Sequence, residues 1–78
     1  GYARHWNSLG AELCERREFA AAEAPLRQAI AIVPAYARAH YNLGYVLDNL
    51  GKTAEAIDCY RRAVALQPDY VKAQINLT

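Results

Sequence analysis

The sequence predicts an all-α fold built from repeated pairs of helices. When the 78-residue chain is shifted against itself by 34 residues, 16 of the 44 aligned positions are identical. The chain's own composition predicts about four such identities by chance. Residues 3–36 and 37–70 form two full copies, and residues 71–78 begin a third. Apolar residues recur at helical spacing within each copy and no segment alternates with period two, so we expect helices and no sheet.

The first half of each copy carries one apolar stripe at i, i+3, i+4 and i+7, which predicts helices over residues 3–16 and 37–50. The stripe consists of Trp6, Leu9, Gly10 and Leu13 in the first copy and of His40, Leu43, Gly44 and Leu47 in the second. We expect Trp6 to pack between the two helices of its copy. His40 takes the matching place, so we expect it to be at least half buried and to bind no metal.

The second half of each copy predicts helices over residues 20–33 and 54–67. The stripe at helical spacing there consists of Ala22, Leu26, Ala29, Ile30 and Val33, and of the matching residues Ala56, Tyr60, Ala63, Val64 and Gln67. Pro34 and Pro68 end these helices because a proline disfavours helical geometry in the residue before it. Pro25 removes a backbone donor inside the first of them, so we expect a bend or a late helix start.

The turns within the two copies differ in one position. Gly51 in the second copy suits a helix end, and Thr53 is expected to cap the next helix. The first copy has Arg17 where the second has Gly51. If this turn requires a positive φ, Arg17 is strained by about 1 kcal/mol relative to glycine.

A 34-residue helix–turn–helix unit with W-x-x-L-G near its start and a proline near its end resembles the tetratricopeptide repeat (TPR). The matching residues are Trp6, Leu9, Gly10, Leu13, Phe19, Ala22, Leu26, Ala29 and Pro34, and in the second copy His40, Leu43, Gly44, Leu47, Gly51, Ala56, Tyr60, Ala63 and Pro68. The resemblance implies a right-handed superhelical solenoid of antiparallel helix-turn-helix repeats. It also implies that the first helices line a concave groove that holds a peptide or a partner protein.

The groove that this resemblance implies has nine candidate peptide-binding residues. They are Arg4, Asn7, Ser8, Arg38, Tyr41, Asn42, Tyr45, Lys72 and Asn76. One column is basic in every copy (Arg4, Arg38 and Lys72), which suits an acidic segment or a terminal carboxylate. Another (Ser8, Asn42 and Asn76) resembles the asparagine ladder of O-linked N-acetylglucosamine transferases, where amides hold a peptide backbone. A solvent-exposed repeat surface that binds no ligand would show the same polar residues. Peptide binding and simple solvation of these residues therefore both stay open.

The family also contains domains that grip the C-termini of chaperones through a clamp of lysine, asparagine and arginine residues. Asn42 and Lys72 match two of the clamp's five positions. Asn7, Ala11 and Asn76 stand where the clamp has its lysine, asparagine and arginine. The match is therefore incomplete, and it does not favour a chaperone as the partner.

Composition and charge exclude several other classes of function. Nine Lys and Arg against eight Asp and Glu give a net charge of +1, which argues against a nucleic-acid binder. No apolar run is long enough to span a bilayer. Cys14 and Cys59, with His5 and His40, match no metal-ligand spacing, and no catalytic constellation is present. We expect no enzyme activity, no cofactor and no metal, and reduced thiols suit a cytoplasmic setting.

The sequence thus predicts a protein-protein interaction module, with two alternatives. The repeats form the scaffold or targeting array of a larger enzyme, such as a glycosyltransferase, or they form a self-associating structural unit. The chain has no methionine and opens at Gly1, so we expect it to be part of a longer protein. The short third copy leaves Val71, Ile75 and Leu77 at an open end of the solenoid, where we expect a homodimer to form.

Overall fold

The computed structural model describes residues 1–69 as four helices, with no strand among these residues. The helices are α1 (Tyr2–Glu15), α2 (Phe19–Ile32), α3 (Ala37–Asn49) and α4 (Thr53–Leu66). All four predicted helices are present, and each bound lies within one residue of its prediction. The third copy at 71–78, with Lys72 and Asn76 and the open end proposed for a homodimer, lies outside the described residues.

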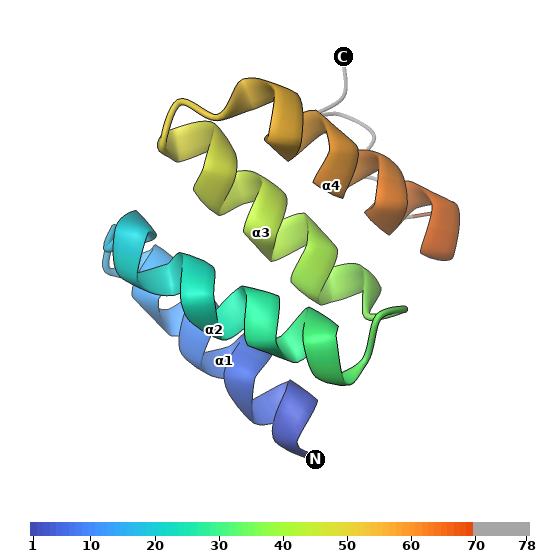
Figure 1. The fold of residues 1–78 in the computed structure, drawn as a ribbon, viewed down its shortest axis with the longest axis horizontal. Helices are drawn as coiled ribbons and strands as arrows, with labels where there is room; N and C mark the ends of the chain where they lie inside the picture. The colour runs from blue at the N-terminus through green and yellow to red at the C-terminus, as the bar shows by residue number, and fades with distance from the viewer. Residues whose placement is uncertain (70–78) are drawn as a thin grey trace.

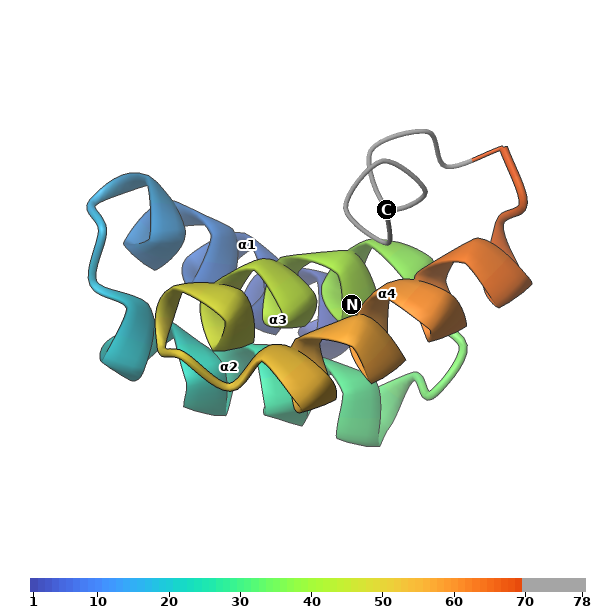
Figure 2. The ribbon, with the colours of Figure 1, turned by 90° about the horizontal axis from the view of Figure 1, so that it is seen from above.

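The helices form two antiparallel hairpins that stack side by side (Figure 1). Helices α1 and α2 make the first hairpin, α3 and α4 make the second, and α2 packs against α3. Figure 2 shows α1 and α3 along one side of the molecule and α2 and α4 along the other. Helices α1 and α3 begin at the same edge of the molecule at which α2 and α4 end (Figure 1). We call this edge the α2–α3 edge, after the connection that lies there.

Each hairpin depends on a glycine in its first helix. A β-carbon built on Gly10 would lie 2.5 Å from Cγ of Leu26, and one built on Gly44 would lie 2.8 Å from Cε1 of Tyr60. Carbon atoms in van der Waals contact lie about 3.5–4.0 Å apart, so neither position has room for a side chain. The glycines therefore let the two helices of each hairpin approach closely, as the repeated stripe predicts.

The core lies mainly between α2, α3 and α4. Its largest fully buried side chains are Leu26, Val46 and Leu47. Helix α3 has neighbours on both sides and buries six residues, whereas α1 is the first helix of the stack and buries only Ala3, Asn7 and Gly10. For the same reason Trp6 is only partly buried, its ring packed edge-on against His5. The expectation that Trp6 forms a core plug is wrong.

His40, in the place that matches Trp6, is 4% exposed, so its predicted burial is confirmed. Its Nε2 donates a hydrogen bond to the carbonyl oxygen of Pro34, at 2.8 Å. This bond ties the start of α3 to the connection that follows α2. Burial of the polar ring is thereby compensated, because a buried donor without a partner costs about 1–3 kcal/mol.

One prediction about the turns is confirmed, and two predictions about the starts of the second helices are wrong. Arg17 has φ 62° and Gly51 has φ 82°, so Arg17 does adopt the left-handed conformation that favours glycine. Thr53 is the first residue of α4 and caps nothing, because Lys52 takes the N-cap position and makes no side-chain capping bond. Helix α2 runs unbroken from Phe19 with Pro25 buried inside it, so the late helix start is wrong.

Candidate peptide-binding face

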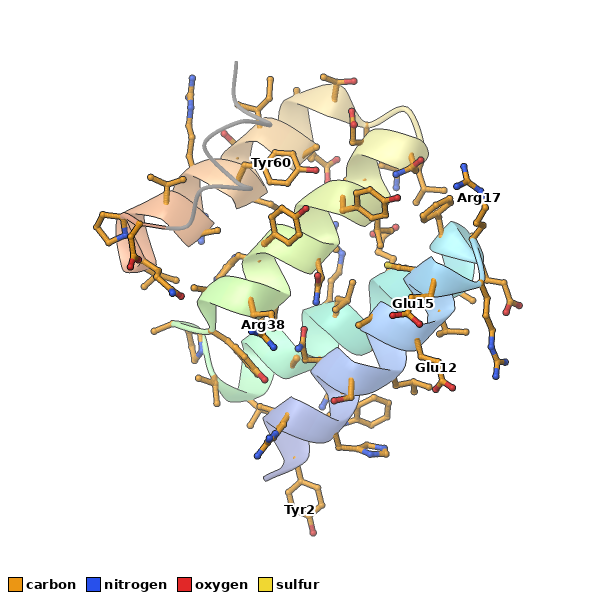
Figure 3. The ribbon with its side chains drawn as sticks, turned by 180° about the vertical axis from the view of Figure 1, so that it is seen from behind. Tyr2, Glu12, Glu15, Arg17, Arg38 and Tyr60 are labelled. Atoms are coloured by element: carbon orange, nitrogen blue, oxygen red, sulfur yellow. The ribbon has the colours of Figure 1, made fainter. Side chains whose placement is uncertain are left out.

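The predicted groove residues of α1 and α3 differ in how far they reach solvent. Arg4, Ser8 and Arg38 are exposed, and Tyr45 is 37% exposed. Tyr41 and Asn42 are half-buried. Figure 3 views the side on which α1 and α3 lie in front, and Arg38 stands out from it. We call the surface formed by Ser8, Arg38, Tyr41, Asn42 and Tyr45 the α1–α3 face.

Asn7 does not belong to the exposed surface. It is 5% exposed, so the expectation that it lines an open groove is wrong. Its Oδ1 accepts a hydrogen bond from Nδ2 of Asn42, at 3.0 Å, across the contact between α1 and α3. Asn7 is buried because it shares one stripe of α1 with Ala3 and Gly10, the stripe turned toward the neighbouring helices. Asn42 is therefore part of the packing between the repeats as well as a surface residue.

Two aromatic side chains of the α1–α3 face are held by neighbouring rings. Tyr45 meets Phe19 edge-on, with ring centroids 5.8 Å apart, and Tyr41 meets Tyr60 at 5.7 Å. Such contacts are favourable for aromatic rings at these distances. They restrict both tyrosines before any partner arrives.

A hollow of about 740 Å³ lies at the α2–α3 edge. Its lining includes Arg4 and Arg38 together with four large apolar side chains that are 41–80% exposed: Tyr2, Ile32, Val33 and Leu66. Val33 ends the stripe that the sequence predicts for this helix, but it is exposed because the helix ends at the preceding residue. We call this feature the edge hollow. The sequence signal for it is the run of apolar residues that continues to the last turn of each second helix.

The opposite side of the molecule carries a charge network. Arg27 donates to Glu23 at 2.8 Å and to Glu55 of α4 at 3.4 Å, and Lys52 lies 3.6 Å from Glu23. The hydrogen bond from Arg27 is the main cause that lowers the pKa of Glu23. Glu23 and Arg27 lie four residues apart on α2, a spacing at which a helix brings opposite charges together. Asp58 and Arg62 have the same spacing on α4, but they form no ion pair among the described residues.

A second hollow, of about 450 Å³, lies beside this network. Its rim carries charges of both signs, Arg27 and Arg62 with Glu55 and Asp58. The positive and negative side chains therefore give this hollow no dominant charge.

The two cysteines lie in partly buried positions. Cys14 and Cys59 are free and half-buried, and burial raises the pKa of both. Within residues 1–69, no three His, Cys, Asp or Glu side chains gather where they could hold a metal ion. None of the described helices is long and apolar enough to cross a membrane.

Comparisons with known proteins agree with the repeat pattern. A family model described as TPR repeat matches residues 10–51, and one described as tetratricopeptide repeat matches residues 37–70. The crystal structure of MamA superposes with a TM-score of 0.93 and 32% sequence identity, over 97% of this chain and 44% of that chain. The chain thus spans less than half the length of MamA. A search of curated protein sequences finds no match. With one family model covering more than half of its residues, the chain belongs to the tetratricopeptide repeat family, right-handed helical solenoids that generally serve as protein-interaction modules.

Proposed function

We propose that the α1–α3 face binds an extended segment of a partner protein. The observation that carries this proposal is the hydrogen bond from Asn42 to Asn7, which fixes a polar side chain on a surface that is otherwise open. Binding normally loses free energy when a mobile side chain is ordered. Since Asn7 already holds Asn42, part of that cost is met in the free protein.

Asn42 retains the groups that a peptide backbone needs. A side-chain amide has two N–H donors and a carbonyl oxygen with two lone pairs. One donor of Asn42 goes to Asn7, which leaves the other donor and the oxygen for a ligand. Both can pair with main-chain groups whatever side chains the peptide carries, so this residue favours binding of extended segments in general.

The aromatic and basic residues of the face would add affinity and selectivity. Tyr45, held edge-on by Phe19, offers a large contact area with a polar tip. Arg38 and the neighbouring Arg4 are exposed cations, and they favour an acidic segment. A scaffold or targeting array of a larger enzyme would use the same face in the same way.

The test is a selection of binding peptides from a random displayed library with the 78-residue chain. Tyr45→Ala should weaken the selected peptides about tenfold or more, because exposed aromatic anchors commonly contribute most to such interfaces. Arg61→Ala, a matched exposed change on α4, should leave the affinity unchanged. If Tyr45→Ala binds as well as the original chain and Arg61→Ala does not, the α1–α3 face is not the binding surface.

A further inference from the structure

The edge hollow combines two kinds of side chain that rarely meet on a solvent-exposed surface. Four of the five large apolar side chains that are exposed in residues 1–69 line it, namely Tyr2, Ile32, Val33 and Leu66. Two arginines, Arg4 and Arg38, line it as well. Clustered exposed apolar surface with a polar rim is typical of interaction sites, whereas scattered apolar residues are ordinary.

The described residues give the edge hollow a positive charge, and its arginines have no partner among residues 1–69. Within the same range no carboxylate lines it, and neither Arg4 nor Arg38 forms an ion pair or hydrogen bond. Arg16 and Arg27, by contrast, both pair with glutamates. Two helices begin and two end at this edge, so their opposed dipoles roughly cancel. The sign of the charge therefore comes from the arginine side chains together with the amino group of Gly1, which also lines the hollow.

This combination selects one class of occupant. A volume of about 740 Å³ accommodates several apolar side chains. A second copy of the chain docked symmetrically through this hollow would bring the arginines of both copies together, and such like charges repel. A nucleic-acid backbone offers phosphates without the apolar groups that would cover Ile32 and Val33. A polypeptide segment with carboxylates beside apolar side chains satisfies both parts of the hollow.

We propose that the edge hollow docks such an acidic, apolar segment of a partner protein, with its carboxylates on Arg4 and Arg38 and its apolar side chains against Ile32, Val33 and Leu66. The inference rests on the proposed function, because Arg38 belongs to both surfaces: it stands out from the α1–α3 face and lines the hollow. A segment lying along the face would reach the hollow at Arg38. The hollow would then decide which segments bind tightly.

Two synthetic peptides test this proposal with the 78-residue chain, by fluorescence polarisation at low salt. The probe is acetyl-Asp-Leu-Leu-Asp-Phe-amide, and its matched control has asparagine in place of each aspartate. The probe should bind about tenfold tighter than the control, because its carboxylates can pair with the two arginines whereas the amides of the control carry no charge. Added salt should reduce this preference, because exposed charges are screened.

Three variants and one control locate the binding. Arg38→Glu should abolish the preference for the acidic probe, while Arg61→Glu, the same charge change on α4, should keep it. Ile32→Gln should weaken both peptides by a similar factor, because it removes apolar contact and keeps the charge. Tyr45→Ala should weaken the library-selected peptides more than it weakens these two short peptides. Circular dichroism on each variant confirms that the helices remain.

Several results would overturn the proposal. Equal affinity for the two peptides, or equal effects of Arg38→Glu and Arg61→Glu, would remove the charge selection. Binding to phosphatidylserine vesicles through Arg38 and Ile32, without binding to the probe, would make the hollow a lipid site instead. If Tyr45→Ala abolishes probe binding and Ile32→Gln does not, the edge hollow has failed while the α1–α3 face stands. If Tyr45→Ala leaves binding of the library-selected peptides intact while Arg38→Glu removes the preference for the acidic probe, the α1–α3 face has failed and the edge hollow stands.

Discussion

The hydrogen bond between Asn7 and Asn42 can be removed by substituting either residue, and the two substitutions should destabilise the fold by different amounts. Asn42→Ala leaves the Oδ1 of Asn7 without its donor at a position that is 5% exposed. Water does not readily reach such a site, so this change should destabilise the fold by about 1–3 kcal/mol.

Asn7→Ala removes the buried partner and leaves Asn42, which is only half-buried and can bond to water. The lost hydrogen bond should therefore cost about 0.5–1.5 kcal/mol, with a further cost for the small cavity. The double variant should be about 1 kcal/mol more stable than the sum of the two single changes predicts, because the bond can be lost only once. A domain of this size has about 4–12 kcal/mol in total, so these differences are large for it.

The assay is urea unfolding followed by circular dichroism for the original chain, both single variants and the double variant. Equal slopes of the unfolding free energy against urea concentration would show that the substitutions leave the unfolded state unchanged. A coupling near zero, or an Asn7→Ala that costs more than Asn42→Ala by 1 kcal/mol or more, would refute the assignment of this bond as the link between the repeats.

Three further changes test the packing, the turn and the charge network. Gly44→Ala should destabilise the fold by about 1–2 kcal/mol in thermal melts, because its β-carbon would meet the ring of Tyr60. This cost should exceed the gain from the higher helix preference of alanine. An unchanged melting temperature would show that the two helices of the hairpin are packed less closely than described. Arg17→Gly should stabilise the fold by up to about 1 kcal/mol, because glycine adopts a positive φ without strain. Loss of the contact between the guanidinium of Arg17 and the ring of Phe19 should offset part of this gain. A clear loss of stability would contradict this reasoning. The lowered pKa of Glu23 means that its ion pair stabilises the fold above the ordinary glutamate pKa, and that this stabilisation is lost as the pH falls through the lowered value. Between pH 7 and pH 3 the melting temperature should therefore fall less for Glu23→Gln than for the original chain. Identical pH profiles of the two melting temperatures would refute the pairing.

The repeat explains why so much of the fold could be predicted from the sequence. Because the pattern occurs twice, both helices of the repeat are predicted from two separate segments. Gly10 and Gly44 lie where the two helices of each hairpin approach most closely. Arg17 could be read as strained because its repeat partner is Gly51, and the structure gives both a positive φ. Local sequence thus determines the hairpins and their turns.

What the sequence could not supply is the contact between one copy and the next. Asn7 was placed on the surface because the family resemblance assigns its position to the groove; the matching residue of the second copy, Tyr41, is half-buried and has a different neighbour. Trp6 was expected to pack between two helices because it starts the apolar stripe, but among the described helices α1 has neighbours on one side only. The edge hollow brings together residues 1–4, 32–38 and 66–67, which no single stripe contains.

The most direct test of the central claim is a chemical-shift map of the ¹⁵N-labelled chain during titration with a peptide selected from a random library. We expect the largest shifts at Arg38, Asn42 and Tyr45, with the side-chain amide of Asn42 among them and its bond to Asn7 retained. Shifts confined to the α2 and α4 side, around Asp58 and Arg61, would contradict the claim that the α1–α3 face binds the partner.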